Sequence, residues 1–95
     1  MTEIWKYPLR PGSNCIEMPA VVSFLSVGFQ GEQLYLWCWV TPRAEVESYH
    51  ILATATGIPL PDNRLRGPSA YIGTAQCENG IVAHVFVMRK PRSGA

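Results

Sequence analysis

Two arginines in a proline-rich segment are the residues of this sequence that best suit binding of an anionic ligand. Arg64 and Arg66 lie next to Asp62 and Asn63. Guanidinium groups form paired hydrogen bonds with phosphate oxygens, and exposed amide groups add further polar contacts. The segment therefore predicts a place where phosphate oxygens could be held.

Three aromatic residues, Tyr35, Trp37 and Trp39, alternate along one apolar run. On a strand, alternate residues share a face, so the three rings form an aromatic stripe. A nucleobase that stacks on such rings gains about 1–3 kcal/mol. Together with the loop arginines, the aromatic stripe predicts a site for a small nucleotide-type ligand. The alternative interpretation is that the stripe packs in the core and the arginines are solvated.

The other reactive residue types lack the spacing that catalysis or metal binding requires. Cys15, Cys38 and Cys77 are far apart, and we expect buried, reduced thiols. His50 and His84 are isolated, and no close pair such as C-x-x-C or H-x-x-x-H occurs. The sequence also lacks a nucleophile elbow and a glycine-rich phosphate loop before a helix. We therefore expect a protein that is not an enzyme and that uses no metal and no cofactor.

The charge balance limits the classes of partner. Eight Lys and Arg against seven Asp and Glu give a net charge of +1, which fits neither a strongly basic nucleic-acid-binding protein nor an acidic DNA mimic. The chain is 47% hydrophobic, but no apolar run is long enough to cross a membrane, so we expect a soluble protein without a membrane partner. The N-terminus has no signal-peptide pattern, which predicts a cytoplasmic location.

Eight prolines and eight glycines divide the 95 residues into short runs rich in β-branched and aromatic residues. The predicted strands are residues 3–9, 15–18, 21–30, 34–40, 49–57, 71–78 and 81–90. Residues 43–48 predict a helical turn or a loop, residues 58–70 one long Pro-rich loop, and residues 91–95 a flexible tail. We therefore predict one all-β domain over residues 1–95, a small antiparallel sandwich or barrel of six to seven strands.

Two of these runs predict more specific arrangements. Residues 34–40 are apolar on both faces, which predicts a central strand that is covered on both sides. Asn79-Gly80 predicts a two-residue type I′ hairpin, with Ala75 opposite His84 and Gly73 opposite Phe86. The last strand is also apolar on both faces, and so thin a core cannot hide every large aromatic ring. We therefore expect a homo-oligomer.

Short motifs also occur in a distinctive order along most of the chain. They are Ile4-Trp5-Lys6-Tyr7-Pro8-Leu9, Met18-Pro19, Leu25-Ser26-Val27, Leu36-Trp37, Val40-Thr41-Pro42, Thr56-Gly57, Pro59-x-Pro61, Tyr71-Ile72-Gly73-Thr74 and His84-Val85-Phe86. In this pattern the chain resembles a family of small bacteriophage and prophage proteins that is classed as a domain of unknown function. The resemblance implies expression in the cytoplasm of a bacterial host, and it brings no established activity.

Three functions are open on these observations. The first, which the loop arginines and the aromatic stripe favour, is a counter-defence sponge that sequesters a nucleotide signal of host immunity without chemical change. The second is a protein inhibitor that docks on a host defence complex in the manner of an anti-CRISPR protein. The third is a structural or assembly component of the virion.

Overall fold

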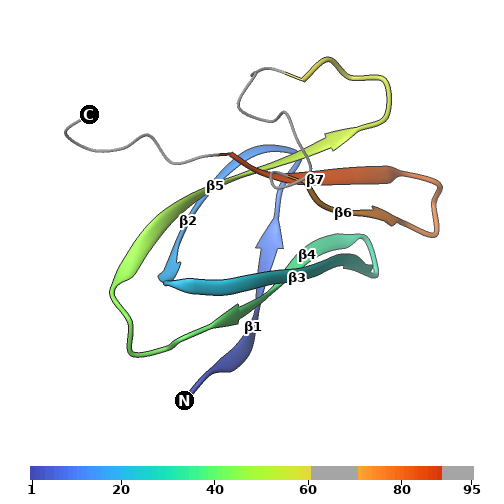
Figure 1. Ribbon diagram of the computed structural model, residues 1–95. Coiled ribbons are helices and arrows are strands. Elements are labelled where there is room, and N and C mark those ends of the chain that lie inside the picture. The colour runs from blue at the N-terminus through green and yellow to red at the C-terminus, as the bar shows by residue number, and fades with distance from the viewer. Residues whose placement is uncertain (61–70, 89–95) are drawn as a thin grey trace.

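The computed structural model describes residues 1–60 and 71–88, and this part of the chain forms seven β-strands and no helix (Figure 1). The strands are β1 (Glu3–Leu9), β2 (Gly12–Pro19), β3 (Val21–Gln30), β4 (Gln33–Val40), β5 (Val46–Ala55), β6 (Tyr71–Gln76) and β7 (Val82–Met88). All strand pairs are antiparallel. The predicted all-β class and strand number are confirmed.

The strands form two sheets in a sandwich-like arrangement. One sheet has three strands in the order β1-β4-β3, and the other has four in the order β2-β5-β7-β6. The chain changes sheets after β1, β2 and β4. Two of these crossings are tied together at Ala20, whose N–H donates to the carbonyl of Glu45 (3.2 Å) and whose carbonyl accepts from the N–H of Thr41 (3.3 Å).

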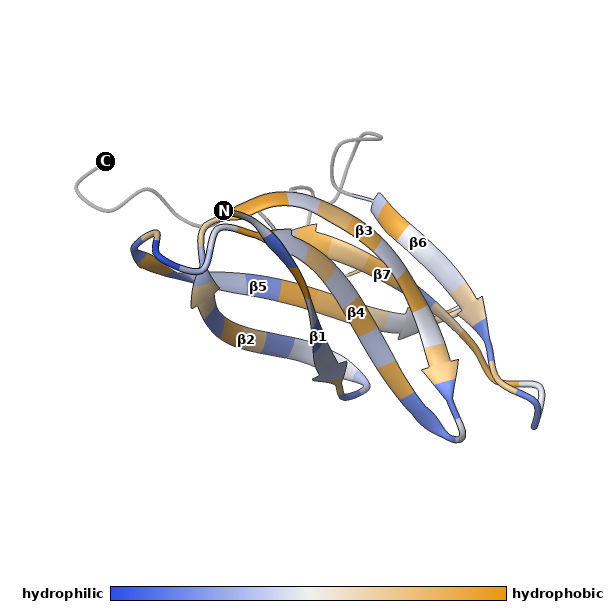
Figure 2. Ribbon diagram, turned by 90° about the horizontal axis from the view of Figure 1, so that it is seen from below, coloured by the Kyte–Doolittle hydropathy of each residue, from blue (hydrophilic) through white to orange (hydrophobic). Residues whose placement is uncertain are grey.

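The core lies between the two sheets and is built from alternate residues of their strands. Figure 2 shows this alternation of apolar and polar residues. Phe24 of β3 and Tyr49 of β5 meet edge to face across the core, with ring centroids 5.8 Å apart. The fully buried side chains are Met18, Leu36, Cys38, Val40, Ile51 and Val85.

The predicted strand bounds agree with the structure to different degrees. β1 and β3 have the predicted bounds, whereas β2 begins three residues earlier than predicted. β5 begins at Val46, so the end of the segment 43–48 is strand and not helical turn or loop. Most of the predicted Pro-rich loop (61–70) and the predicted tail lie outside the described residues.

β4 is covered on one face only, so the prediction that both faces are covered is wrong. Leu34, Leu36, Cys38 and Val40 are buried, whereas the residues between them are half-buried or exposed. The physical reason is the number of layers. A two-layer sandwich packs one face of each sheet, and no strand among the described residues covers the outer face of the three-stranded sheet.

The β6–β7 turn also differs from the prediction. The N–H of Gly80 donates to the carbonyl of Cys77 (2.9 Å), and the N–H of Cys77 donates to the carbonyl of Ile81 (2.8 Å). Gly80 has φ +94°, while Asn79 does not have the positive φ that a type I′ turn requires at both central positions. The loop therefore has three residues, 78–80, with glycine in the left-handed position.

Because of this extra loop residue, the pairing of the hairpin is shifted by one position. The predicted pairs Ala75–His84 and Gly73–Phe86 are wrong. The observed pairs are Gln76–Val82, Ala75–Ala83, Thr74–His84, Gly73–Val85 and Tyr71–Phe86. Successive residues of a strand point to opposite faces of the sheet, so a shift of one residue gives every side chain of the hairpin a different cross-strand neighbour.

The cysteines are free thiols in this fold. Cys38 and Cys77 are buried as predicted. Cys15 is exposed, which corrects the prediction for this residue, because it lies on the outward face of the edge strand β2.

Candidate functional site

The outer face of β4 carries the aromatic stripe that the sequence indicated. Tyr35, Trp37 and Trp39 alternate with the buried residues of β4, so their rings lie on the side of the sheet that faces away from the core. Tyr35 and Trp37 are half-buried, and Trp39 is 41% exposed. The alternative interpretation, in which the stripe packs in the core, is therefore wrong.

Neighbouring residues hold the rings of the stripe in place. Trp37 leans over Gly28 of β3, where a Cβ would lie 3.5 Å from Cζ3 of the indole. The ring centroids of Tyr35 and Trp37 are 6.1 Å apart at an interplanar angle of 55°. The indole of Trp37 thus packs over the backbone of Gly28, and the stripe is a packed surface layer with one open end at Trp39.

Lys6 supplies a positive charge at the Tyr35 end of the stripe. Its ammonium group lies 4.5 Å from the centroid of the Tyr35 ring, which is a cation–π distance. The same group donates a hydrogen bond to Oε1 of Gln30 (2.8 Å). Because Lys6 is on β1 and Gln30 is on β3, the lysine side chain extends across β4.

The Trp39 end of the stripe is apolar and hollowed. Ile4, Leu25 and Trp39 line a shallow hollow there, together with Thr2 and Glu3. Leu25 and the nearby Val22 lie at register shifts of β3, where a strand residue has no partner in β4. These irregularities leave both side chains exposed, and Leu25 forms an apolar patch with Ile4 and Trp39 around the hollow.

The loop residues that the sequence indicated, Asp62, Asn63, Arg64 and Arg66, lie outside the described residues. Leu60, which precedes their segment, follows β5, and Tyr71, which succeeds it, begins β6. Both strands belong to the four-stranded sheet, whereas the aromatic stripe belongs to the other sheet. Whether the loop arginines lie near the stripe therefore stays a prediction.

A cluster of hydroxyl groups around His84 was not predicted from the sequence. Nε2 of His84 lies 2.6 Å from Oγ1 of Thr56, and Nδ1 lies 3.0 Å from Oγ1 of Thr74. The Tyr71 hydroxyl is hydrogen-bonded to the same Thr74 oxygen. The predicted register placed Ala75 opposite His84 and so concealed the contact. A prediction of a three-residue loop at Glu78-Asn79-Gly80 would have paired Thr74 with His84 and so indicated this contact.

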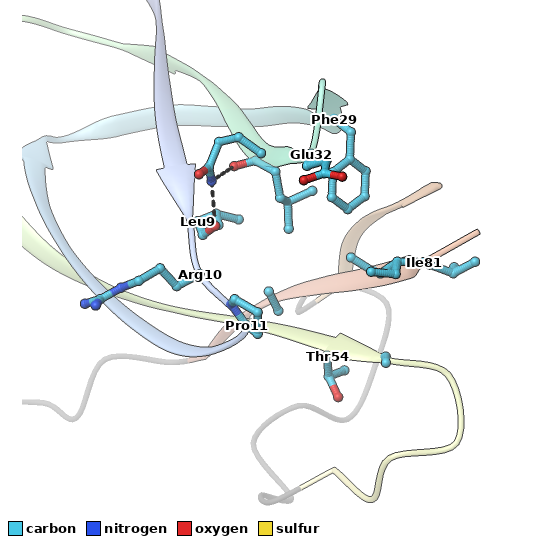
Figure 3. A pocket seen from close by; sticks show the side chains of 13 residues that line it. Leu9, Arg10, Pro11, Phe29, Glu32, Thr54 and Ile81 are labelled. Atoms are coloured by element: carbon cyan, nitrogen blue, oxygen red, sulfur yellow. Dashed lines mark hydrogen bonds between the residues drawn. The ribbon is translucent and has the colours of Figure 1, made fainter. Parts of the chain in front are cut away.

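A cavity of about 250 Å³ opens between the sheets at one end of the sandwich (Figure 3). Its apolar lining includes Leu9, Phe29, Leu34, Ala53 and Ala83. Arg10, Glu32 and Gln33 are among its polar lining residues. In Figure 3, the side chain of Arg10 points away from the cavity, whereas the carboxylate of Glu32 lies beside the ring of Phe29.

Burial suppresses the ionisation of the fully buried thiol. It raises the pKa of Cys38 to about 12, so this residue stays protonated at neutral pH. The reactive form of cysteine is the thiolate, and Cys38 is therefore unsuited to nucleophilic chemistry. In residues 1–60 and 71–88, the structure contains no group of three or more His, Cys, Asp or Glu side chains placed to hold a metal ion.

Residues 1–94 match a protein family described as a domain of unknown function, DUF7352. The chain belongs to the DUF7352 family. No curated protein and no solved structure matches the chain. The family match confirms the part of the resemblance that concerns a domain of unknown function, whereas a bacteriophage origin stays a prediction.

DUF7352 membership assigns no ligand, so the candidate sites of this chain are defined by their geometry. The aromatic stripe, the His84 cluster and the end cavity lie on three different parts of the fold. Among the described residues of this DUF7352 chain, no helical segment is long and apolar enough to span a bilayer. Of the three sites, the stripe combines exposed rings with a nearby positive charge.

Proposed function

We propose that this protein is a non-enzymatic binding protein that captures a small nucleotide-type ligand on the outer face of β4. The observation that carries the proposal is the outward orientation of the aromatic stripe. An exposed ring forgoes the favourable burial of aromatic surface, and a tryptophan that is exposed beside a hollow is suited to stack on a ligand. Here Trp39 keeps 41% of its surface exposed beside a hollow.

The chemistry of this face suits a nucleotide in three ways. A base can stack on Trp39 or Trp37, with a gain of about 1–3 kcal/mol per base. Ser23 and Ser26 pair with Trp39 and Trp37 across the β3–β4 ladder, which places hydroxyl groups beside both rings for contacts with base edges or a sugar. Lys6 offers a charge for a phosphate at the far end of the stripe. Capture in this way makes and breaks no covalent bond.

The biological setting in this proposal is counter-defence. A phage-encoded sponge in the cytoplasm of a bacterial host would lower the free concentration of a nucleotide immune signal. The resemblance to small bacteriophage proteins supports this setting. Assembly as a homo-oligomer, which the exposed apolar side chains favour, would place several copies of the stripe in one particle. The proposal does not depend on Arg64 and Arg66.

The apolar patch favours a second candidate function, in which the same face binds a protein. Ile4 and Leu25, which line the hollow beside Trp39, are 63% and 43% exposed. Contiguous apolar surface of this kind often marks a protein interface. The partner in this alternative is a host defence complex, or other copies of the chain in a virion.

The test is calorimetric titration of the full chain with a panel of mono-, di- and cyclic nucleotides, supported by native mass spectrometry. Trp39→Ala should weaken binding by about 5- to 150-fold, which corresponds to loss of one stacked base. Tyr71→Ala is a matched control, because Tyr71 is an aromatic residue with 46% exposure on the other sheet. This control should bind as the native protein does.

Three outcomes separate the possibilities. Absence of nucleotide binding by the native protein, or equal weakening by both substitutions, would overturn the assignment of the stripe. Co-purification of a host protein that is lost in the Trp39→Ala variant would favour the second candidate. Unchanged nucleotide affinity of a variant with both Arg64→Ala and Arg66→Ala would remove the loop from the site.

A further inference from the structure

The end cavity is a separate feature from the outer face of β4, because it lies between the two sheets. Leu9, Phe29 and Leu34 line it from the three-stranded sheet. The opposite wall includes the small residues Ala53 and Ala83, beside the larger Ile81 and Val82. Alanine side chains are too short to fill the space under the larger residues. The alanines thus leave a cavity between the sheets that opens to solvent at one end of the sandwich.

The volume of the cavity sets the size of a ligand. An apolar protein cavity of about 150 Å³ holds benzene, which has six heavy atoms. On that scale, 250 Å³ holds a body of roughly ten heavy atoms, the size of a bicyclic aromatic ring system. The lining is mostly apolar, which suits such a ring and not a sugar or a free phosphate.

The polar groups at the mouth of the cavity set the charge of the ligand. The side-chain amide nitrogen of Gln33 donates to the carbonyls of Leu9 (2.9 Å) and Leu34 (2.8 Å). Both of its hydrogens are therefore used, and Gln33 can offer a ligand only its oxygen as an acceptor. The Arg10 side chain points away from the cavity, while the Glu32 carboxylate lies beside Phe29 (Figure 3). The mouth thus presents acceptors and a negative charge.

We propose that the end cavity binds a small aromatic amine. The aromatic body lies between the sheets against Phe29 and Leu34, and the ammonium group lies at the mouth, where it donates to the carboxylate of Glu32. The ligand is charged oppositely to the nucleotide proposed for the outer face, and the two sites share no described lining residue. The two proposals are therefore independent.

The test uses tryptamine, indole and indole-3-acetate as probes of one ring system with a positive, a neutral and a negative side group. Binding to the full chain is measured by calorimetry and by shifts of the Leu9 and Leu34 methyl signals in NMR spectra. We expect tryptamine to bind about two- to fivefold more tightly than indole, as for an exposed charge pair. Indole-3-acetate should bind most weakly.

Two substitutions test separately whether the ammonium group binds at Glu32 and whether the aromatic ring lies in the apolar part of the cavity. Glu32→Gln should remove the preference for tryptamine and leave the affinity for indole unchanged. Glu45→Gln is the matched control, since Glu45 is an exposed carboxylate beyond the opposite end of β4, and it should keep the preference. Ala83→Leu should abolish binding of all three probes by filling the cavity.

Two results would overturn the proposal. Failure of all three probes to bind saturably would show that the cavity takes no aromatic ring. Equal affinities for the three probes, or a preference for tryptamine that survives Glu32→Gln, would remove Glu32 from the site. If Ala83→Leu does not fold, the Glu32→Gln comparison and the methyl shifts still decide the question. Nucleotide binding by the Glu32→Gln variant should equal that of the native protein.

Discussion

The two sheets approach closely at Gly73. A Cβ at this position would lie 3.2 Å from Cγ2 of Val27, which is tighter than an ordinary contact. Because Val27 is itself packed against the core, it has little room to move. Gly73→Ala should therefore lower the free energy of unfolding by about 1–3 kcal/mol, the usual cost of overpacking, measured by urea denaturation.

Gly28→Ala is the matched control for this prediction. Its Cβ would meet Cζ3 of Trp37 at 3.5 Å, an ordinary van der Waals distance. The substitution should be neutral or stabilise by up to about 1 kcal/mol, because alanine restricts the unfolded chain. Val27→Ala combined with Gly73→Ala should recover part of the lost stability. Equal effects of the two glycine substitutions would contradict the close approach of the sheets.

The buried thiol of Cys38 makes stability depend on pH in the alkaline range. Burial raises its pKa from 9.0 to about 12, so the unfolded chain releases this proton first as the pH rises. The contribution is fully present below pH 9 and is lost between pH 9 and about 12, by at most about 1.4 kcal/mol per pH unit. Burial raises the pKa of Tyr7 and Tyr49 in the same direction.

Urea denaturation at pH values from 8 to about 10.5 measures this dependence. Stability should fall above pH 9 in the native protein and fall less steeply in a Cys38→Ala variant. The same slope in both proteins would show that Cys38 does not carry the effect, whatever the cost of the substitution at neutral pH.

For single residues, the sequence predicts which side chains share a face but not which face is buried. The alternation of Tyr35, Trp37 and Trp39 with Leu36 and Cys38 is visible in the sequence. Both sets are apolar, however, so hydropathy cannot decide which set turns inward. The choice depends on where the second sheet lies, and that is a property of the whole fold.

At the scale of elements, the β6–β7 turn gives the sharpest prediction. Gly80 has φ +94°, which alanine adopts only with strain, so Gly80→Ala should destabilise by about 1–2 kcal/mol. Asn79 has no positive φ, and its Oδ1 accepts a hydrogen bond from the N–H of Ile81 (3.1 Å). Asn79→Ala should therefore remove only that hydrogen bond and lower the free energy of unfolding by about 1 kcal/mol or less.

Thermal unfolding of the two variants checks this order. Asn79→Asp keeps the acceptor and should be close to the native protein. In a type I′ turn, alanine at either position would be strained. Similar, large losses in Gly80→Ala and Asn79→Ala would therefore favour the two-residue turn and contradict the observed register.

Strand positions could be predicted better than strand pairing. Prolines and glycines mark the ends of β1 and β3, because proline removes a ladder donor and glycine permits the turn. The dipeptide Asn79-Gly80 is compatible with a two-residue turn and with a three-residue loop that ends in glycine. Local sequence cannot separate these, and the difference of one residue concealed the contact between Thr74 and His84.

At the scale of the whole molecule, the three-stranded sheet explains why the aromatic stripe is available. It has the four-stranded sheet on one side, and no strand of residues 1–60 or 71–88 covers the other. Its outer face is therefore available for contact with a ligand or another protein chain. The sequence predicts more large aromatic rings than so thin a core can bury. In the fold one of these rings, that of Trp39, lies on this outer face beside a hollow.

The end cavity could not be predicted from the sequence. Its lining comes from four separate chain segments, around residues 9–11, 29–34, 53–55 and 81–83. Each segment is an ordinary strand end or turn when taken alone. The void exists only because large residues of one sheet lie opposite alanines of the other, and this depends on how the two sheets are stacked.

The most direct test of nucleotide binding on the outer face of β4 follows the indole N–H signals of the three tryptophans in ¹⁵N NMR spectra during a nucleotide titration. Trp5 is an internal reference, because its ring packs against the core, although its indole N–H donates to Oε1 of Glu3 at the edge of the hollow (2.8 Å). If a nucleotide stacks on the outer face of β4, the Trp39 and Trp37 signals shift with saturation and the Trp5 signal shifts less than either. An unmoved Trp39 signal throughout the nucleotide panel would contradict binding there.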